Sequence, residues 1–104
     1  EAIQALIDEL EAVAAAKLDQ LASLSARVDE LKRRPANEPK AEALKRRELI
    51  VTLDNQLNLM EGELRTKVAN GRDELLKMID EYAAPGTVAD ESRARLGSIT
   101  KRVG

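Results

Sequence analysis

The chain has 104 residues and a mass of 11.4 kDa, so it has room for at most one domain. Charged residues make up 35% of it and aromatic residues only 1%, and this scarcity of large apolar side chains excludes a thick globular core. The chain contains no Cys and no His, which excludes disulfides, Cys/His zinc sites, thiol nucleophiles and Ser-His-Asp triads. The remaining composition, rich in Ala and Leu, predicts long helices that meet along thin seams.

Residues 1–34 contain no Gly or Pro, and their apolar residues recur at steps of three and four, which places them on one face of a helix. This face contains Ile3, Leu6, Leu10, Leu18, Leu21, Leu24, Val28 and Leu31. Its middle is lined by alanine, so a partner helix can approach closely there. We therefore expect a first helix over residues 1–34.

Pro35 interrupts this pattern and predicts a turn over residues 35–37, because proline disfavours helical geometry in the residue before it. Asn37 is expected to cap a second helix over residues 38–82, with Pro39 in the tolerant first turn. The apolar stripe of this helix contains Ile50, Leu53, Leu57, Met60, Leu64, Leu75, Met78 and Tyr82. The pattern thus predicts two long helices joined by a short turn.

Two further interruptions follow along the chain. Asn70 and Gly71 predict a local break or kink inside the second helix. Residues 83–104 are expected to form a turn and a short C-terminal helix, with Thr87 and Asp90 as its capping box. An ordered but irregular tail is the alternative for this segment.

These elements predict an all-α fold, an antiparallel helical hairpin over residues 1–82 that forms an intramolecular coiled coil. A loop of a few residues favours antiparallel neighbours. In the alternative, the two helices stay splayed and pair with another chain, because a heptad pattern specifies a seam but not whose helix fills it.

Apolar residues that lie off the seam predict an interface with other protomers, because a hairpin with so thin a core is marginal on its own. The predicted contacts are Leu49, Leu59, Leu76, Leu96 and Ile99. Leu44 and Val51 also lie off the seam. Since the first residue is Glu rather than Met, we expect the chain to be a piece of a longer protein.

Charge is distributed unevenly along the chain. Residues 1–31 carry seven acids and two bases, whereas residues 32–47 carry seven bases and two acids. The basic cluster at the tip of the hairpin can contact the phosphates of RNA or DNA, contact acidic groups of a neighbouring protein, or stay solvated. The candidate contact residues are Lys32, Arg33, Arg34, Lys45, Arg46 and Arg47, with Arg93 and Arg95 as a second, weaker group.

No residues form a catalytic arrangement. The carboxylate pairs Asp73-Glu74 and Asp80-Glu81 are adjacent on a helix, so they point in different directions from a charged, solvated surface. The glycines form no phosphate-binding motif. We therefore expect no enzymatic activity, no catalytic or metal site, no cofactor and no small-molecule substrate. We also expect no membrane span, because no apolar run approaches the length of about 20 residues that one needs.

Several of these features occur together in one known family. They are the sparse heptad of the first helix, Pro35 at the turn, Arg46-Arg47 early in the second helix, the gap-free apolar run to Leu64, the turn at Pro85-Gly86 followed by Val88, Asp90 and Glu91, and the later Ser98-Ile99. In this arrangement most of the chain resembles the N-terminal domain of hantavirus nucleoproteins. Its turn is basic where the turn of the family is acidic.

The resemblance implies a nucleocapsid protein that coats a viral RNA genome and polymerises head to tail. This N-terminal hairpin would be the oligomerisation module that mediates contacts between protomers, while a separate core domain would hold most of the RNA. The implied location is the virion nucleocapsid and the host cytoplasm. The alternative is a cellular coiled-coil adaptor, intracellular and soluble, that binds a cytoskeletal or chaperone-linked protein partner.

Overall fold

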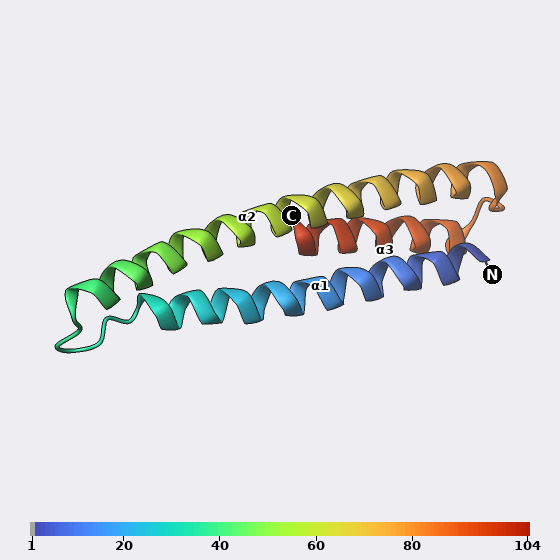
Figure 1. Cartoon of the computed structure of the whole chain (residues 1–104). Coiled ribbons are helices and arrows are strands. Elements are labelled where there is room, and N and C mark those ends of the chain that lie inside the picture. The colour runs from blue at the N-terminus through green and yellow to red at the C-terminus, as the bar shows by residue number, and fades with distance from the viewer. Residues whose placement is uncertain (1) are drawn as a thin grey trace.

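The computed structural model describes residues 2–104, which form three helices and no strands (Figure 1). The helices are α1 (Ala2–Lys32), α2 (Lys40–Tyr82) and α3 (Thr87–Val103). α1 and α2 run antiparallel, and α3 folds back along both of them to give a rod of 66 × 17 × 17 Å. The predicted all-α class and the antiparallel hairpin with a C-terminal helix are confirmed, and the splayed alternative is not the arrangement observed.

The third helix divides the rod into two halves. It starts at the end of the rod that holds the N-terminus and stops near the middle (Figure 1), where Val103 lies beside Leu21 of α1 and Leu64 of α2. We call residues 2–21 and 64–103 the three-helix half, and residues 22–63 the two-helix half. The two-helix half ends in the turn between α1 and α2, which we call the tip.

The hydrophobic core lies in the three-helix half. All ten buried residues of the main apolar cluster belong to it: Ile7, Ala14, Leu21, Leu64, Val68, Leu75, Ile79, Ala89, Leu96 and Ile99. Complete burial of a large aliphatic side chain stabilises a fold by about 1.5–3 kcal/mol. In the two-helix half, the buried apolar residues among those described are only Val28 and Ala43. Most of the stabilising apolar burial therefore comes from the half that α3 covers.

The second helix passes through Asn70 and Gly71 without interruption, so the predicted break there is wrong. A Cβ atom at Gly71 would lie 3.0 Å from Cδ1 of Leu10. The glycine therefore provides room for the Leu10 side chain of α1. The small side chain of Ala14 likewise lets α1 lie close to the neighbouring helices, and Ala14 is buried in the core cluster.

The turn between the first two helices is longer than predicted. α1 ends at Lys32 rather than at residue 34, and α2 begins at Lys40 rather than at residue 38. Asn37 does not cap α2, because it lies in the turn with a φ of 61°, a left-handed conformation that asparagine tolerates. The residue at the cap position is Pro39, whose carbonyl oxygen accepts a hydrogen bond from the Ala43 amide at 3.0 Å.

The C-terminal segment is a regular helix rather than an irregular tail. Thr87 does not form the predicted capping box with Asp90, because it is already the first helical residue and Gly86 precedes it with a φ of 150°. Only glycine adopts this backbone region readily. Tyr82, predicted as the last residue of the apolar stripe, is exposed because α2 ends there.

Candidate interaction surfaces

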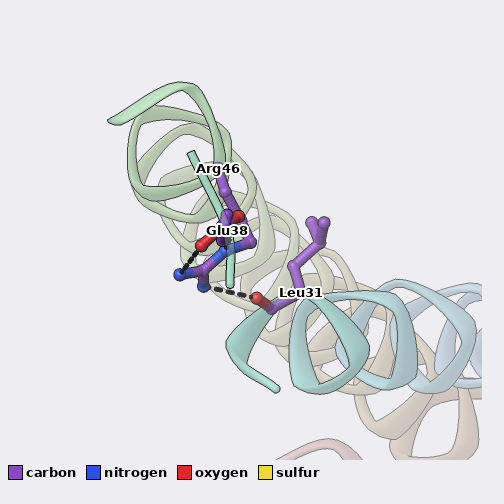
Figure 2. Close-up of polar contacts among 3 residues, drawn as sticks. All are labelled: Leu31, Glu38 and Arg46. Atoms are coloured by element: carbon purple, nitrogen blue, oxygen red, sulfur yellow. Dashed lines mark hydrogen bonds and ion pairs between the residues drawn. The ribbon is translucent and has the colours of Figure 1, made fainter. Parts of the chain in front are cut away.

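One side chain of α2 holds the turn at the tip (Figure 2). The guanidinium of Arg46 donates hydrogen bonds to both carboxylate oxygens of Glu38, at 2.8 and 3.0 Å, and to the carbonyl oxygen of Leu31 at 2.8 Å. Leu31 lies in the last turn of α1, where carbonyl groups have no intrahelical partner. Arg46 therefore ties the turn to the end of α1, and we call these three residues the Arg46 clamp.

The Arg46–Glu38 pair of the clamp is the least exposed ion pair among the described residues. The side chain of Arg46 is 13% exposed and that of Glu38 is 8% exposed. Hydrogen bonding to Arg46 holds the pKa of the Glu38 carboxyl below its ordinary value, and the positive charges of Arg34 and Arg47 act in the same direction. The same hydrogen bonds raise the pKa of Arg46. Arg46, predicted as a contact residue, is thus engaged inside the chain.

The other bases of the tip face solvent. Lys32 lies 3.9 Å from Asp54, and the remaining predicted tip bases are exposed without an ion pair among the described residues. Those bases are Arg33, Arg34, Lys45 and Arg47. Arg34 and Arg47 line a surface hollow of about 690 Å³ together with Lys40, the exposed Leu44 and Glu38, whose carboxylate is hydrogen-bonded to Arg46.

Lys40 belongs to this basic hollow but was not among the predicted contact residues. Its position in the sequence contains the necessary signal, because Lys40 and Arg47 are two helical turns apart and therefore share one side of α2. The tip can attract phosphate or carboxylate groups through Arg34, Lys40 and Arg47.

The second surface is the outer face of α2, which lies opposite the seam in the two-helix half. Leu44, Val51 and Leu59 are 57%, 58% and 66% exposed. Residues 49–60, which run through this face, contain a single charged residue, Asp54. Leu59 borders a shallow hollow of about 660 Å³, whose other lining residues are Asn58, Gly62, Glu63, Thr66, Lys67 and Asn70. The outer face is therefore apolar and poor in charge on an otherwise highly charged rod.

Two predicted basic contacts in the three-helix half are engaged with acids of the same chain. Arg93 lies 2.9 Å from Asp80 of α2, and Arg95 lies 2.6 Å from Asp8 of α1. Hydrogen bonding to Asp8 raises the pKa of Arg95. These exposed pairs attach α3 to both neighbouring helices, although each such pair adds little stability.

Three apolar residues predicted to contact another protomer are covered inside the chain. Leu96 is 0% exposed and Ile99 is 2% exposed, and both belong to the core cluster. Leu76 is partly buried and packs against the same cluster. The prediction is wrong for Leu96 and Ile99, because α3 folds onto the hairpin and buries its own apolar face there, whereas the contact predicted for Leu76 stays a prediction. Leu49 and Leu59, by contrast, remain exposed.

The acidic residues do not gather into a site. Asp73 pairs with Arg72 at 3.0 Å, whereas Asp80 pairs with Arg93, so the two predicted carboxylate pairs take part in separate ion pairs. Within residues 2–104, no group of three or more carboxylates is placed to hold a metal ion. No helix in that range is both long enough and apolar enough to span a bilayer.

Comparison of the chain with protein-family models, with curated proteins and with solved structures gives no match. Its function is therefore inferred from two surfaces of the two-helix half. One is the basic hollow around Arg34, Lys40 and Arg47, and the other is the outer face of α2. The first is suited to an anionic group, and the second to an apolar protein surface.

Proposed function

We propose that the chain is the N-terminal oligomerisation module of a nucleoprotein that encapsidates a viral RNA genome, and that it mediates contacts between protomers. The observation that carries this proposal is the outer face of α2, where Leu44, Val51 and Leu59 are more than half exposed. Covering apolar surface is favourable by about 25 cal/mol per Å². These three side chains lie about two helical turns apart along the outer face, and we propose that they are the apolar contact points for a second protomer.

The resemblance to hantavirus nucleoproteins supports the choice of partner. The apolar spacing of the two long helices and the turns at Pro35 and Pro85 carry that resemblance. An elongated antiparallel hairpin with a C-terminal helix is suited to packing side by side in a repetitive assembly. In this proposal the chain acts without catalysis, in the virion nucleocapsid and the host cytoplasm.

Auxiliary contact with RNA is the second part of the proposal. Arg34, Lys40 and Arg47 surround one hollow, and exposed bases bind phosphates through charge and release of counterions. The tip lacks aromatic side chains that could stack on bases, so the contact would be independent of sequence. A separate core domain would hold most of the RNA.

Light scattering over a concentration series tests self-association. We expect the molar mass to rise above the monomer value of 11.4 kDa as concentration increases. Leu59→Ser should shift this rise to higher concentration, whereas Tyr82→Ser, which removes an exposed apolar residue from the three-helix half, should leave it unchanged. A mass of 11.4 kDa at every concentration would contradict the proposal, and a discrete complex with an unrelated protein would favour the adaptor alternative.

Fluorescence anisotropy with a single-stranded RNA oligonucleotide tests the tip. The double variant Arg34→Gln, Arg47→Gln should bind RNA more weakly and with a smaller dependence on salt, because it contacts fewer phosphates. The double variant Arg72→Gln, Lys77→Gln, which also loses two positive charges but in the three-helix half, is the control. Arg46 is avoided because its loss would open the clamp. Unchanged affinity in the double variant would exclude the RNA part of the proposal.

A further inference from the structure

One exposed row of α2 is symmetric in its chemistry. Lys45, Thr52, Leu59, Thr66 and Asp73 follow one another at steps of seven, so they lie in one line along a helix that takes part in a coiled coil. All five residues are exposed. We call this row the heptad stripe. Along the chain, the stripe runs from a base through a threonine, a leucine and a threonine to an acid. When two such stripes run in opposite directions and meet at Leu59, the base of each faces the acid of the other.

We infer that two copies of the chain pair along this stripe with their α2 helices antiparallel, around a two-fold axis at Leu59. The inference rests on the proposed function, since it specifies how the oligomerisation module meets a second copy. In this pair Lys45 of each copy faces Asp73 of the other, and the two Leu59 side chains meet at the axis. A parallel pair in register would instead bring Lys45 against Lys45 and Asp73 against Asp73, which is unfavourable.

The charge of α2 outside the stripe favours the same orientation. Besides Lys45, residues 40–47 carry three bases and one acid, and besides Asp73, residues 73–81 carry three acids and one base. Between them, residues 49–60 contain a single charge. A two-fold antiparallel pair therefore places a basic end beside an acidic end twice, and of the charge-poor stretch only its end around Leu59 meets its counterpart at the axis.

The surface around Leu59 is suited to close approach. Leu59 is the most exposed of the large apolar residues in the two-helix half, and it borders the hollow that contains Gly62. A Cβ atom at Gly62 would meet nothing within 4 Å, so this position is open to a partner side chain. Leu59 from each copy can thus pack beside the hollow of the other. The stripe from Lys45 to Asp73 gives a contact of about 42 Å along the helix.

The rows of residues on either side of the heptad stripe bring no like charges together when the two copies meet at Leu59. Glu42 falls opposite Lys77 of the second copy, and Asn55 falls opposite Gly62. Asp73 already lies 3.0 Å from Arg72, and both side chains remain partly exposed, so the carboxylate can still receive Lys45. Lys45 itself makes no ion pair among the described residues.

Charge reversal provides the first test. Lys45→Glu and Asp73→Lys should each raise the dissociation constant of the dimer about tenfold, because each creates two like-charge contacts per dimer. The double variant restores opposite charges and should return to within about threefold of the original value. Lys17→Glu, an exposed reversal on α1, should have no such effect. Failure of the double variant to recover would overturn the antiparallel register.

Cross-linking provides the second test. Because the sequence contains no cysteine, an introduced cysteine is the only thiol that can react. A mixture of Thr52→Cys and Thr66→Cys proteins should cross-link with a short bismaleimide, because these positions face each other in the antiparallel pair. Thr52→Cys alone should not, since its two copies lie about 21 Å apart along the helix axis. Cross-linking of Thr52→Cys to itself would indicate a parallel pair and overturn the inference. A chain that stays monomeric in light scattering would overturn the proposed function as well, whereas a dimer that fails both tests would overturn only this pairing.

Discussion

The two halves of the rod differ in what covers their apolar residues. In the three-helix half, α3 lies on both long helices, and all members of the main buried cluster are found there. In the two-helix half, α2 leaves Leu44, Val51 and Leu59 largely exposed. The outer face of α2 is exposed in both halves, but it bears Leu59 in the two-helix half and Thr66 and Asp73 on the same row in the three-helix half.

The halves also differ in how they use their basic residues. In the three-helix half, Arg93 and Arg95 pair with acids of α2 and α1 and so help to attach α3. At the tip, one arginine closes the clamp, while Arg34, Lys40 and Arg47 stay exposed around a hollow. We conclude that apolar burial in the three-helix half supplies most of the stability of the molecule, and we propose that contacts with other molecules involve the exposed face of α2 and the bases of the tip.

The largest expected effect tests this division directly. Leu96→Ala removes a completely buried side chain from the core cluster and should lower the free energy of unfolding by about 3 kcal/mol. Leu59→Ala removes the same atoms from an exposed position and should change it by less than about 0.5 kcal/mol. Urea denaturation followed by circular dichroism at a dilution where the chain is monomeric measures both values. Equal losses would mean that α3 is not docked as described.

Substitution of two glycines of α2, one in each half of the rod, compares the packing of the two halves and should change stability less than Leu96→Ala. Gly62→Ala should stabilise the monomer by up to about 1 kcal/mol, because alanine is the better helix former and its methyl group meets nothing within 4 Å. Gly71→Ala should lose much of that gain, because the methyl group would lie 3.0 Å from Leu10 Cδ1 and the leucine must shift. Urea denaturation followed by circular dichroism measures the change in the free energy of unfolding for both variants. Equal stabilisation by both substitutions would show that the seam at Gly71 is loosely packed.

The long helices were predictable because their stripes persist over many turns and Pro35 separates them. The docking of α3 was not, because apolar spacing identifies which residues seek burial but not which helix covers them. Leu96 and Ile99 have the same spacing whether they pack inside the chain or against another protomer. Leu76 likewise lies off the seam between the two long helices, and in the structure it packs against the core cluster to which α3 contributes.

The tip was predictable only as a basic cluster. Arg46 and Arg47 are identical in type and adjacent in sequence, yet one lies in the clamp and the other faces solvent. Adjacent side chains of a helix point about 100° apart, and Arg46 is the one that reaches Glu38, in the turn that Asn37 enters with a left-handed conformation. Long-range hydrogen bonds to a backbone carbonyl, such as that of Leu31, have no signal in residue spacing.

Breaking the clamp should loosen the tip without unfolding the rod. Arg46→Met keeps the aliphatic stem but leaves the Leu31 carbonyl and the Glu38 carboxylate without their donor. Amide hydrogen exchange should become several-fold faster at the end of α1 and the start of α2, while the three-helix half keeps its protection. Arg47→Met, an equal loss of charge without lost hydrogen bonds among the described residues, should leave exchange nearly unchanged. Similar exchange in both variants would show that the clamp does not order the tip.

The smallest expected effect is a dependence of the tip on pH. Hydrogen bonding to Arg46 lowers the pKa of Glu38 in the folded chain below its unfolded value of about 4.3. The stabilisation from this pair is therefore complete above the unfolded pKa and is lost as the pH falls through the lowered, folded pKa. Hydrogen exchange at the tip, corrected for intrinsic rates, should accelerate in that acid range. Glu38→Gln should abolish this dependence, because an amide does not titrate, and acid sensitivity that persists in Glu38→Gln would show that Glu38 is not its source.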